Sequence, residues 1–155
     1  MIEKISTYSL YSRLLRLGGE WEVVDVVLNE LQEELHITIH YKLDTWTDKT
    51  TGEVFSIFDH RTERTWRHLD CMEYKTVVHC RLPRIKTAAG NVKTIEYDWA
   101  EDGLSHTKKF ENQCIKVLQA THCQKTAADL MRTSDDKICG IMHHSVERGL
   151  QKPTF

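Results

Sequence analysis

Basic side chains suited to binding phosphate gather in the middle of the chain. Residues 61–93 hold eight lysines and arginines against three acidic residues, whereas residues 1–60 hold five against eleven. Trp66 and Tyr74 lie among them, and this composition suits a surface that follows a nucleic-acid backbone. A solvated sheet face that resists aggregation would explain the same pattern equally well. The candidate phosphate contacts are Arg61, Arg64, Arg67, Arg81, Arg84 and Lys86.

A second stretch with functional spacing is QKTAADLMRTSDDKICGIM, residues 124–142. Ala128 suits a close crossing of two helices, and Ser134 suits the N-cap of the next helix. Ile138 and Ile141 follow that cap at core-facing spacing. A helix-turn-helix that enters a DNA groove requires this arrangement. An ordinary three-helix unit would need most of the same residues, so both interpretations stay open.

The helix after Ser134 carries an ambiguous set of side chains. It opens on two aspartates, which stabilise the free amides of a helix N-terminus but repel phosphate. An aspartate can also accept a hydrogen bond from cytosine N4 in the major groove. Acidity therefore does not exclude base recognition, but most phosphate contacts must come from elsewhere. The candidate DNA-reading residues are Asp135, Asp136, Lys137, His143 and His144.

The periodicity of the apolar residues changes along the chain from that of strands to that of helices. Several alternating runs in residues 20–99 predict a small antiparallel β module, preceded by a short helix at 10–17. The segment AEDGLSH at 100–106 is the joint, and helical periodicity follows it. The predicted fold class is α+β, with a β-rich domain over 1–100 and a helical domain over 101–155.

Composition predicts an ordered, soluble, cytoplasmic protein without a membrane partner. Hydrophobic residues make up 40% and charged residues 28% of the chain, as is usual for globular domains. No apolar run reaches the ~20 residues that cross a bilayer, and the N-terminus lacks a secretion signal. The five cysteines form no C-x-x-C pair, so no disulfide framework or zinc knuckle is predicted.

Histidines offer weaker signs of a metal site. His36 and His40 fall on one face of a predicted strand, where an exposed polar face explains them more simply than a metal ion does. His68 and Cys71 have H-x-x-C spacing, and His79 and Cys80 follow, but adjacent side chains on a strand point to opposite faces. We therefore predict no metal ligands and no cofactor.

Four stretches occur in an order that resembles a known family. They are DHRTERTWRHLD at 59–70, the strand HCRLPRI, the segment YDWAEDG and the final VERGL. Together they resemble the N-terminal region of the ISL-three family of bacterial insertion-sequence transposases, and W-R-H-L-D is their most specific part. The likeness spans residues 20–150. It implies a zinc-ribbon-like β module followed by a helix-turn-helix, which bind double-stranded DNA at terminal inverted repeats.

Two departures change what this resemblance implies. Where the family carries its cysteine pairs, this chain has Asp48 and Thr51, then Thr87 and Gly90, and these do not form a structural zinc set. The β module is therefore expected to fold without zinc. The catalytic domain of a transposase would follow VERGL, and the chain has no room for it. We expect a protein that does not cut or join DNA.

The expected function is that of a non-enzymatic, transposase-derived DNA-binding protein. The alternative is a protein-interaction module, an inhibitor or adaptor that acts on a larger protein or nucleoprotein complex. Homodimerisation stays open. Basic charge continuous across residues 61–93 and the last helix would favour DNA, whereas an apolar patch on either would favour a protein partner.

Overall fold

The computed structural model describes residues 2–151, which form four helices and two four-stranded sheets. The main sheet has the strand order β1-β2-β6-β5, and the small sheet has the order β3-β4-β7-β8. Its strands are β1 Trp21–Asn29, β2 Glu34–Tyr41, β3 Thr45–Thr47, β4 Val54–His60, β5 Arg64–Cys71, β6 Tyr74–Cys80, β7 Pro83–Lys86 and β8 Val92–Thr94. The helices are α1 Thr7–Leu15, α2 Lys108–Thr121, α3 Gln124–Met131 and α4 Asp135–Gln151. The predicted α+β class is confirmed.

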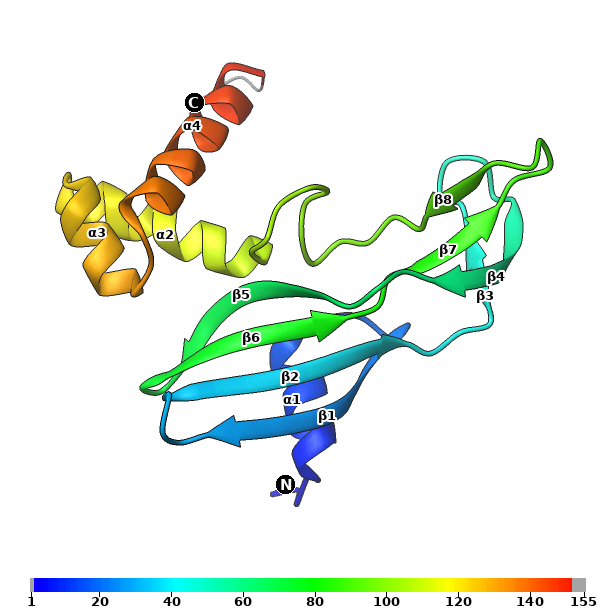
Figure 1. Ribbon diagram of the computed structural model, residues 1–155, viewed down its shortest axis with the longest axis horizontal. Helices are drawn as coiled ribbons and strands as arrows, with labels where there is room; N and C mark the ends of the chain where they lie inside the picture. Colours follow the sequence, from blue (N-terminus) through cyan, green and yellow to red (C-terminus); the bar gives the residue numbers. More distant parts are fainter. Residues whose placement is uncertain (1, 152–155) are drawn as a thin grey trace.

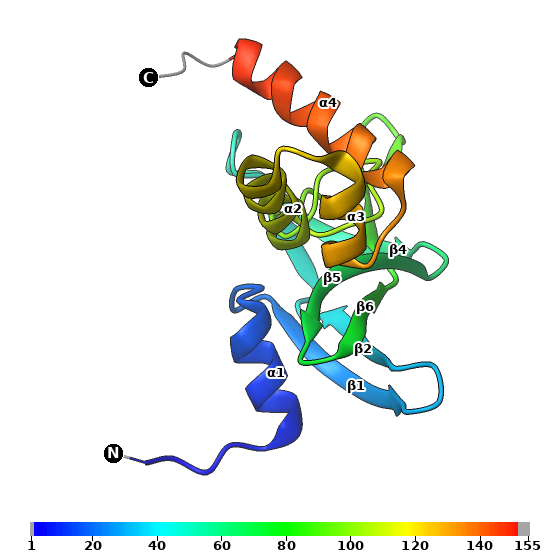
Figure 2. The ribbon, with the colours of Figure 1, turned by 90° about the vertical axis from the view of Figure 1, so that its left-hand side faces the viewer.

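Helices α2–α4 form a helical unit that lies above one end of the main sheet, while the small sheet extends beyond the other end (Figure 1). Helix α1 packs beside β1, and α2 packs along the edge strand β5 (Figure 2). The helical unit and the small sheet are therefore separated along the longest axis of the molecule. None of the helices within residues 2–151 is long and apolar enough to cross a membrane.

The alternating pattern led us to predict a purely antiparallel β module. The main sheet is mixed instead. Strands β2 and β6 pair in parallel, with Ile37 opposite Val78. The hairpins β1–β2 and β5–β6 are each antiparallel, and strands β3 and β4 fall between them in the sequence. Because a period of two fixes only which face a side chain occupies, the alternation could not reveal which strand lies beside which.

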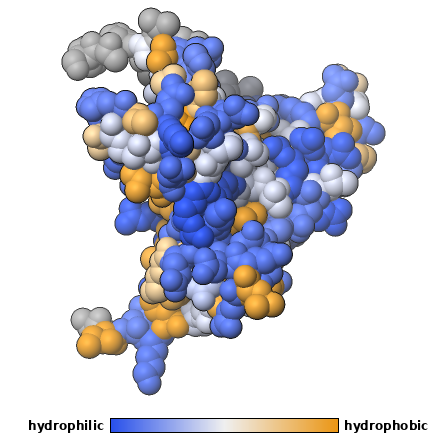
Figure 3. Space-filling view, turned by 60° about the vertical axis from the view of Figure 1, so that its left-hand side comes forward, coloured by the Kyte–Doolittle hydropathy of each residue, from blue (hydrophilic) through white to orange (hydrophobic). Residues whose placement is uncertain are grey.

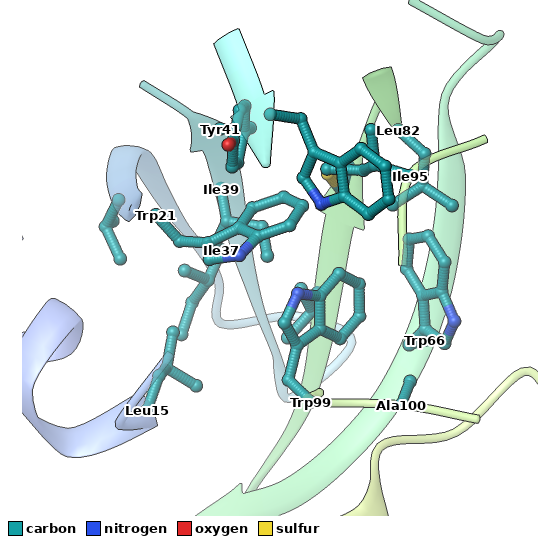
Figure 4. Close-up of a cluster of buried hydrophobic side chains, with 14 of the residues drawn as sticks. Leu15, Trp21, Ile37, Ile39, Tyr41, Trp66, Leu82, Ile95, Trp99 and Ala100 are labelled. Atoms are coloured by element: carbon teal, nitrogen blue, oxygen red, sulfur yellow. The ribbon is translucent and has the colours of Figure 1, made fainter. Parts of the chain in front are cut away.

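An aromatic cluster forms the centre of the core shared by the two sheets (Figure 4). Trp99 packs edge-on against Trp66 and Trp21, with ring centroids 4.7 and 5.6 Å apart, a favourable geometry for aromatic pairs. Leu82 and Ile95 extend this core toward the small sheet. The small sheet is thereby anchored on one face, and its other face carries polar side chains.

The helical unit has its own core and well-formed caps. Thr107 accepts a hydrogen bond from the Phe110 amide at 3.3 Å, and Ser134 accepts one from the Lys137 amide at 3.1 Å. Ala128 and Ile138 are completely buried. The predicted cap at Ser134 and the predicted burial of Ala128, Ile138 and Ile141 are confirmed. Leu130, which helical spacing also suggested for this core, is 63% exposed.

Ile138→Ala is expected to lower the free energy of unfolding by about 3 kcal/mol, because it leaves a cavity in a small core. Urea unfolding followed by circular dichroism measures this change. Val146→Ala, on the exposed side of the same helix, is the control and should change stability by less than about 0.5 kcal/mol. Equal effects of the two substitutions would contradict the placement of Ile138.

Candidate nucleic-acid interface

The structure separates the predicted DNA-binding residues into two groups. One group lies on or beside the small sheet, and its members are Arg61, Arg81, Arg84 and Lys86. The other group lies on β5 and α4, and its members are Arg64, Arg67, Asp135, Asp136, Lys137, His143 and His144. These groups differ in what their side chains contact, so they are described in turn.

Strand register brings Arg84 and Lys86 to one face of the small sheet, and hydrogen bonds join Arg61 to Thr94 and Arg81 to Arg61 beside it. Arg84 lies opposite Asp59 on β4 and opposite Thr94 on β8. Lys86 is two residues further along β7, so it projects from the same face. A β-bulge in β4 between Ile57 and Asp59 inserts Phe58 as an extra residue. This bulge turns the Phe58 ring toward Lys86.

Arg84 is neutralised by its partner. Its Nε donates to Asp59 Oδ1 at 2.6 Å, and its Nη2 donates to Asp59 Oδ2. The hydrogen bond from Arg84, more than its charge, holds the pKa of the Asp59 carboxyl below its ordinary value. The bidentate pair therefore adds no net charge to the face, and Arg84 is a weaker candidate for phosphate than the sequence suggested.

Three other cations on this face have no carboxylate partner within residues 2–151. Arg61 is exposed and donates to Thr94 Oγ1 at 3.3 Å. Arg81 is exposed and donates to the Arg61 carbonyl at 3.0 Å. Lys86 Nζ lies 5.5 Å from the centroid of the Phe58 ring, which is 52% exposed. Free cations beside an exposed aromatic ring suit a nucleic-acid backbone and its bases.

Arg67, from the second group, connects the main sheet to the helical unit. Its side chain is 15% exposed and donates to Asp70 at 2.5 Å. It also donates to the carbonyls of Met131 and Arg132, at 3.3 and 3.1 Å, where α3 ends. Its guanidinium lies over the Phe110 ring. Carbonyls at a helix C-terminus lack partners within the helix, so Arg67 satisfies them and is not free to bind phosphate.

Arg64 and Lys137 are also engaged within the protein. Arg64 stacks over the Trp66 ring at 4.8 Å and donates to the Leu104 carbonyl at 3.2 Å. Lys137 donates to Ser105 Oγ at 2.6 Å, and burial lowers the pKa of its ammonium. Both side chains hold the joint between the sheet and α2. These partners within the protein make both side chains weaker candidates for DNA contacts than the sequence suggested.

His144 belongs to an ion-pair network around the buried Glu111, which is 1% exposed. Glu111 contacts His144 Nδ1 at 3.0 Å and His106 Nε2 at 3.2 Å, and Arg148 donates to it as well. His144 Nε2 lies 2.8 Å from Glu101, which also receives Arg148. His144 therefore faces α2 and the 101–106 joint, and not a DNA groove.

Glu101, Glu111 and His144 bring one ligand atom each within 4.8 Å of one another, which is a spacing open to a metal ion. The guanidinium of Arg148, however, donates to both carboxylates. It supplies the positive charge that a metal would otherwise supply. The arrangement is better described as a salt-bridge network that fixes α4 to α2.

The exposed side of α4 is acidic. Asp135, Asp136 and Glu147 are exposed there with His143, whereas Lys137 and Arg148 turn inward. Continuous basic charge from residues 61–93 onto α4 is therefore absent from the described part of the chain. Figure 1 also places α4 and the small sheet at opposite ends of the molecule. Among the residues that the sequence nominated, the exposed cations without a carboxylate partner in the described part of the chain therefore lie at the small sheet.

Phe58 is the side chain at this face that the sequence did not single out. His60 ends the same strand but pairs with the buried Pro83, on the opposite face from Arg84. The run VFSIF breaks strict alternation, which is the one local signal of the bulge that exposes Phe58. His60 is half-buried, and burial, His40 and Arg81 lower the pKa of its imidazole. It therefore adds no charge to the face at neutral pH.

No family model, curated protein or solved structure matches this chain.

His68 predicts a loss of stability in mild acid. It is buried against Thr107, with Nδ1 2.7 Å from Oγ1, and burial and then Lys109 lower its pKa from 6.5 to about 4. In the unfolded chain the His68 imidazole therefore becomes protonated below pH 6.5, whereas in the folded chain it becomes protonated only near pH 4. This stabilisation is complete above pH 6.5, and up to about 3 kcal/mol of it is lost as the pH falls to 4.

Urea unfolding at pH 7 and pH 4.5 measures this dependence. His68→Gln should reduce the difference between the two pH values, because glutamine does not titrate. His143→Gln, at an exposed position, is the matched control and should leave the difference unchanged. Identical pH dependence in all three proteins would contradict this role for His68.

Proposed function

We propose that the protein binds double-stranded DNA without catalysing a reaction, and that the small sheet provides the contact surface. The observation that carries this proposal is a set of three exposed cations, Arg61, Arg81 and Lys86, that have no carboxylate partner among the described residues. Lys86 lies over the exposed Phe58 ring. The charges of these three cations are free to displace the counterions of a phosphate backbone. Of the eleven DNA-binding residues predicted from the sequence, the proposal keeps only those at the small sheet.

Two features support the finer interpretation as a transposase-derived protein with a degenerate zinc ribbon. The turns TDKTTG and TAAGN, which stand where the family carries metal ligands, connect β3 to β4 and β7 to β8. Both hairpins belong to the small sheet. Hydrogen bonds from Gly52 to Asp48 and from Gly90 to Thr87 close the two turns. Backbone hydrogen bonding therefore supplies the closure that zinc would supply in a ribbon.

The arrangement of α3 and α4 also supports the helix-turn-helix interpretation, but we propose a structural role for this unit. Helices α3 and α4 are joined by Arg132–Ser134, and Ser134 caps the second of them. We propose that this unit buttresses the main sheet through Arg67 and Arg132, since its exposed side repels phosphate. In this proposal Asp135, Asp136 and His143 do not read bases.

A protein-interaction module is the second candidate function. The acidic side of α4 favours it. So do Val27 on the edge strand β1 and Leu31 in the turn that follows this strand, which are 50% and 99% exposed. On the face shown in Figure 3, however, hydrophobic residues form separate patches among hydrophilic ones. A large protein interface has a continuous apolar centre. The separated patches therefore favour nucleic acid over a broad protein interface.

Fluorescence anisotropy with a labelled duplex tests the proposal. The double substitution Arg61→Ala and Lys86→Ala should weaken binding by about tenfold near 0.1 M salt for each phosphate that the variant no longer neutralises. The slope of log K against log salt should fall by about one for each such phosphate. Lys116→Ala with Lys125→Ala removes the same charge from exposed positions of the helical unit, and should leave binding nearly unchanged.

Two results would reject the proposal. A larger loss of affinity in the Lys116 and Lys125 variant would place the DNA on the helical unit. Absence of salt-dependent binding in the wild-type chain would reject nucleic acid and favour a protein partner.

A further inference from the structure

A pair of histidines lies on the solvent-facing side of the main sheet. His36 on β2 alternates with the buried Leu35 and Ile37, so it points away from the core. His79 on β6 alternates with the buried Val78 and Cys80 and points the same way. The parallel register pairs Thr38 with His79, which makes the two histidines diagonal neighbours across adjacent strands.

The two imidazole rings meet through one nitrogen each. His36 Nδ1 lies 2.7 Å from His79 Nε2, and the ring centroids are 5.0 Å apart. This approach depends on the parallel pairing of β2 with β6, which is why the sequence did not indicate it. The sequence suggested His36 with His40 instead, but His40 stacks on His60 with centroids 5.8 Å apart.

A carboxylate lies at each outer end of this pair. His36 Nε2 is 2.9 Å from Glu34 Oε2, and His79 Nδ1 is 3.3 Å from Glu63 Oε2. An ionised carboxylate only accepts hydrogen bonds, so each outer nitrogen carries the proton. In neutral imidazoles the two inner nitrogens then both present lone pairs. Two lone pairs at this distance repel each other unless a cation lies between them.

We propose that His36 Nδ1 and His79 Nε2 bind a divalent transition-metal ion, of the class that prefers imidazole: Zn²⁺, Ni²⁺ or Cu²⁺. Glu34 and Glu63 orient the two ligands from behind, as carboxylates do behind metal-binding histidines. Water completes the coordination. The site uses none of the residues of the ribbon turns and none of the three cations of the proposed DNA surface.

The geometry and the exposure fit this role. Zinc–nitrogen distances of ~2.0–2.1 Å at a tetrahedral angle place two ligand nitrogens about 3.3 Å apart. The observed 2.7 Å reaches that separation by a small rotation of either side chain. The side chains of His36 and His79 are 29% and 20% exposed, so an ion and its waters can enter. With two protein ligands the site exchanges its ion readily and is empty in protein purified without added metal.

Isothermal titration of the metal-free chain with Zn²⁺ tests the proposal. One ion per chain should bind, and His36→Gln and His79→Gln should each lower the affinity by at least about tenfold. Glu34→Ala should lower it by about tenfold, since removing an outer carboxylate weakens its ligand. His143→Gln removes an exposed histidine from α4 and should leave the affinity unchanged.

Long-range ¹H–¹⁵N spectra of the imidazoles identify the atoms involved. Zn²⁺ should shift His36 Nδ1 and His79 Nε2, while the outer nitrogens keep their protons. Circular dichroism establishes that each variant is folded. Zn²⁺ binding with the same affinity in both histidine variants would place the ion elsewhere and overturn the proposal. Absence of binding by Zn²⁺, Ni²⁺ and Cu²⁺ would also overturn it, and would leave a shared proton between the two rings.

Discussion

Glu111→Ala is expected to lower the free energy of unfolding by about 4 kcal/mol, because it removes the buried carboxylate that Arg148, His106 and His144 share. Glu111 is 1% exposed and receives His106, His144 and Arg148. Burial raises the pKa of its carboxyl, but hydrogen bonds from His144 and His106 and the charge of Arg148 outweigh burial. The net pKa lies below the ordinary value.

The sign of the pH dependence follows from that direction. A carboxyl whose pKa is lower in the folded state stabilises the fold above its unfolded pKa and loses that contribution as the pH falls through the folded pKa. Urea unfolding of Glu111→Ala and Glu111→Gln at neutral pH measures how much unfolding free energy each substitution removes. Glu147→Ala, on the exposed side of α4, is the control. Wild-type stability in Glu111→Ala would contradict the network.

Arg67→Ala is expected to cost about 4 kcal/mol of unfolding free energy, because it removes charged hydrogen bonds from a mostly buried site. The substitution exposes the Met131 and Arg132 carbonyls and removes one of two cations beside Asp70. Arg67→Lys should rescue little of this loss, since an ammonium lacks the planar fork that reaches several acceptors at once. Urea unfolding of both variants measures the effect.

Arg61→Ala is the matched control for Arg67→Ala. Its side chain is exposed, so stability should change by less than about 0.5 kcal/mol, while DNA affinity should fall. Arg67→Ala is thus expected to lower stability, and Arg61→Ala is expected to lower DNA affinity. Full stability in Arg67→Ala together with impaired DNA binding would show that Arg67 contacts phosphate, as its position in the sequence first suggested.

The contrast between these arginines shows what sequence patterns can and cannot predict. Arg61 and Arg67 occur in one short basic stretch, and periodicity treats them alike. Arg67, however, meets the Met131 carbonyl, 64 residues away along the chain, and no local pattern encodes that contact. A cation that donates hydrogen bonds to a carbonyl far away in the sequence cannot be distinguished from an unbound cation by the sequence pattern.

Features that depend on residues close in the sequence were predicted better than the pairing of strands. The cap at Ser134 and the buried Ile138 depend on residues within one helix turn, and both predictions were confirmed. The parallel pairing of β2 with β6 depends on how two hairpins meet. That pairing creates the contact between His36 and His79 and was beyond the reach of the alternating pattern.

Amide chemical-shift mapping of the ¹⁵N-labelled chain with a short DNA duplex would locate the proposed binding surface residue by residue. We predict that the largest shifts fall at residues 58–61 and 81–86, which carry the free cations and Phe58, and at residues 92–94, where Thr94 accepts a hydrogen bond from Arg61. The exposed side of α4 should remain nearly unshifted, because its carboxylates repel phosphate. Shifts concentrated on residues 134–148, or no shifts on adding DNA, would contradict DNA binding by the small sheet.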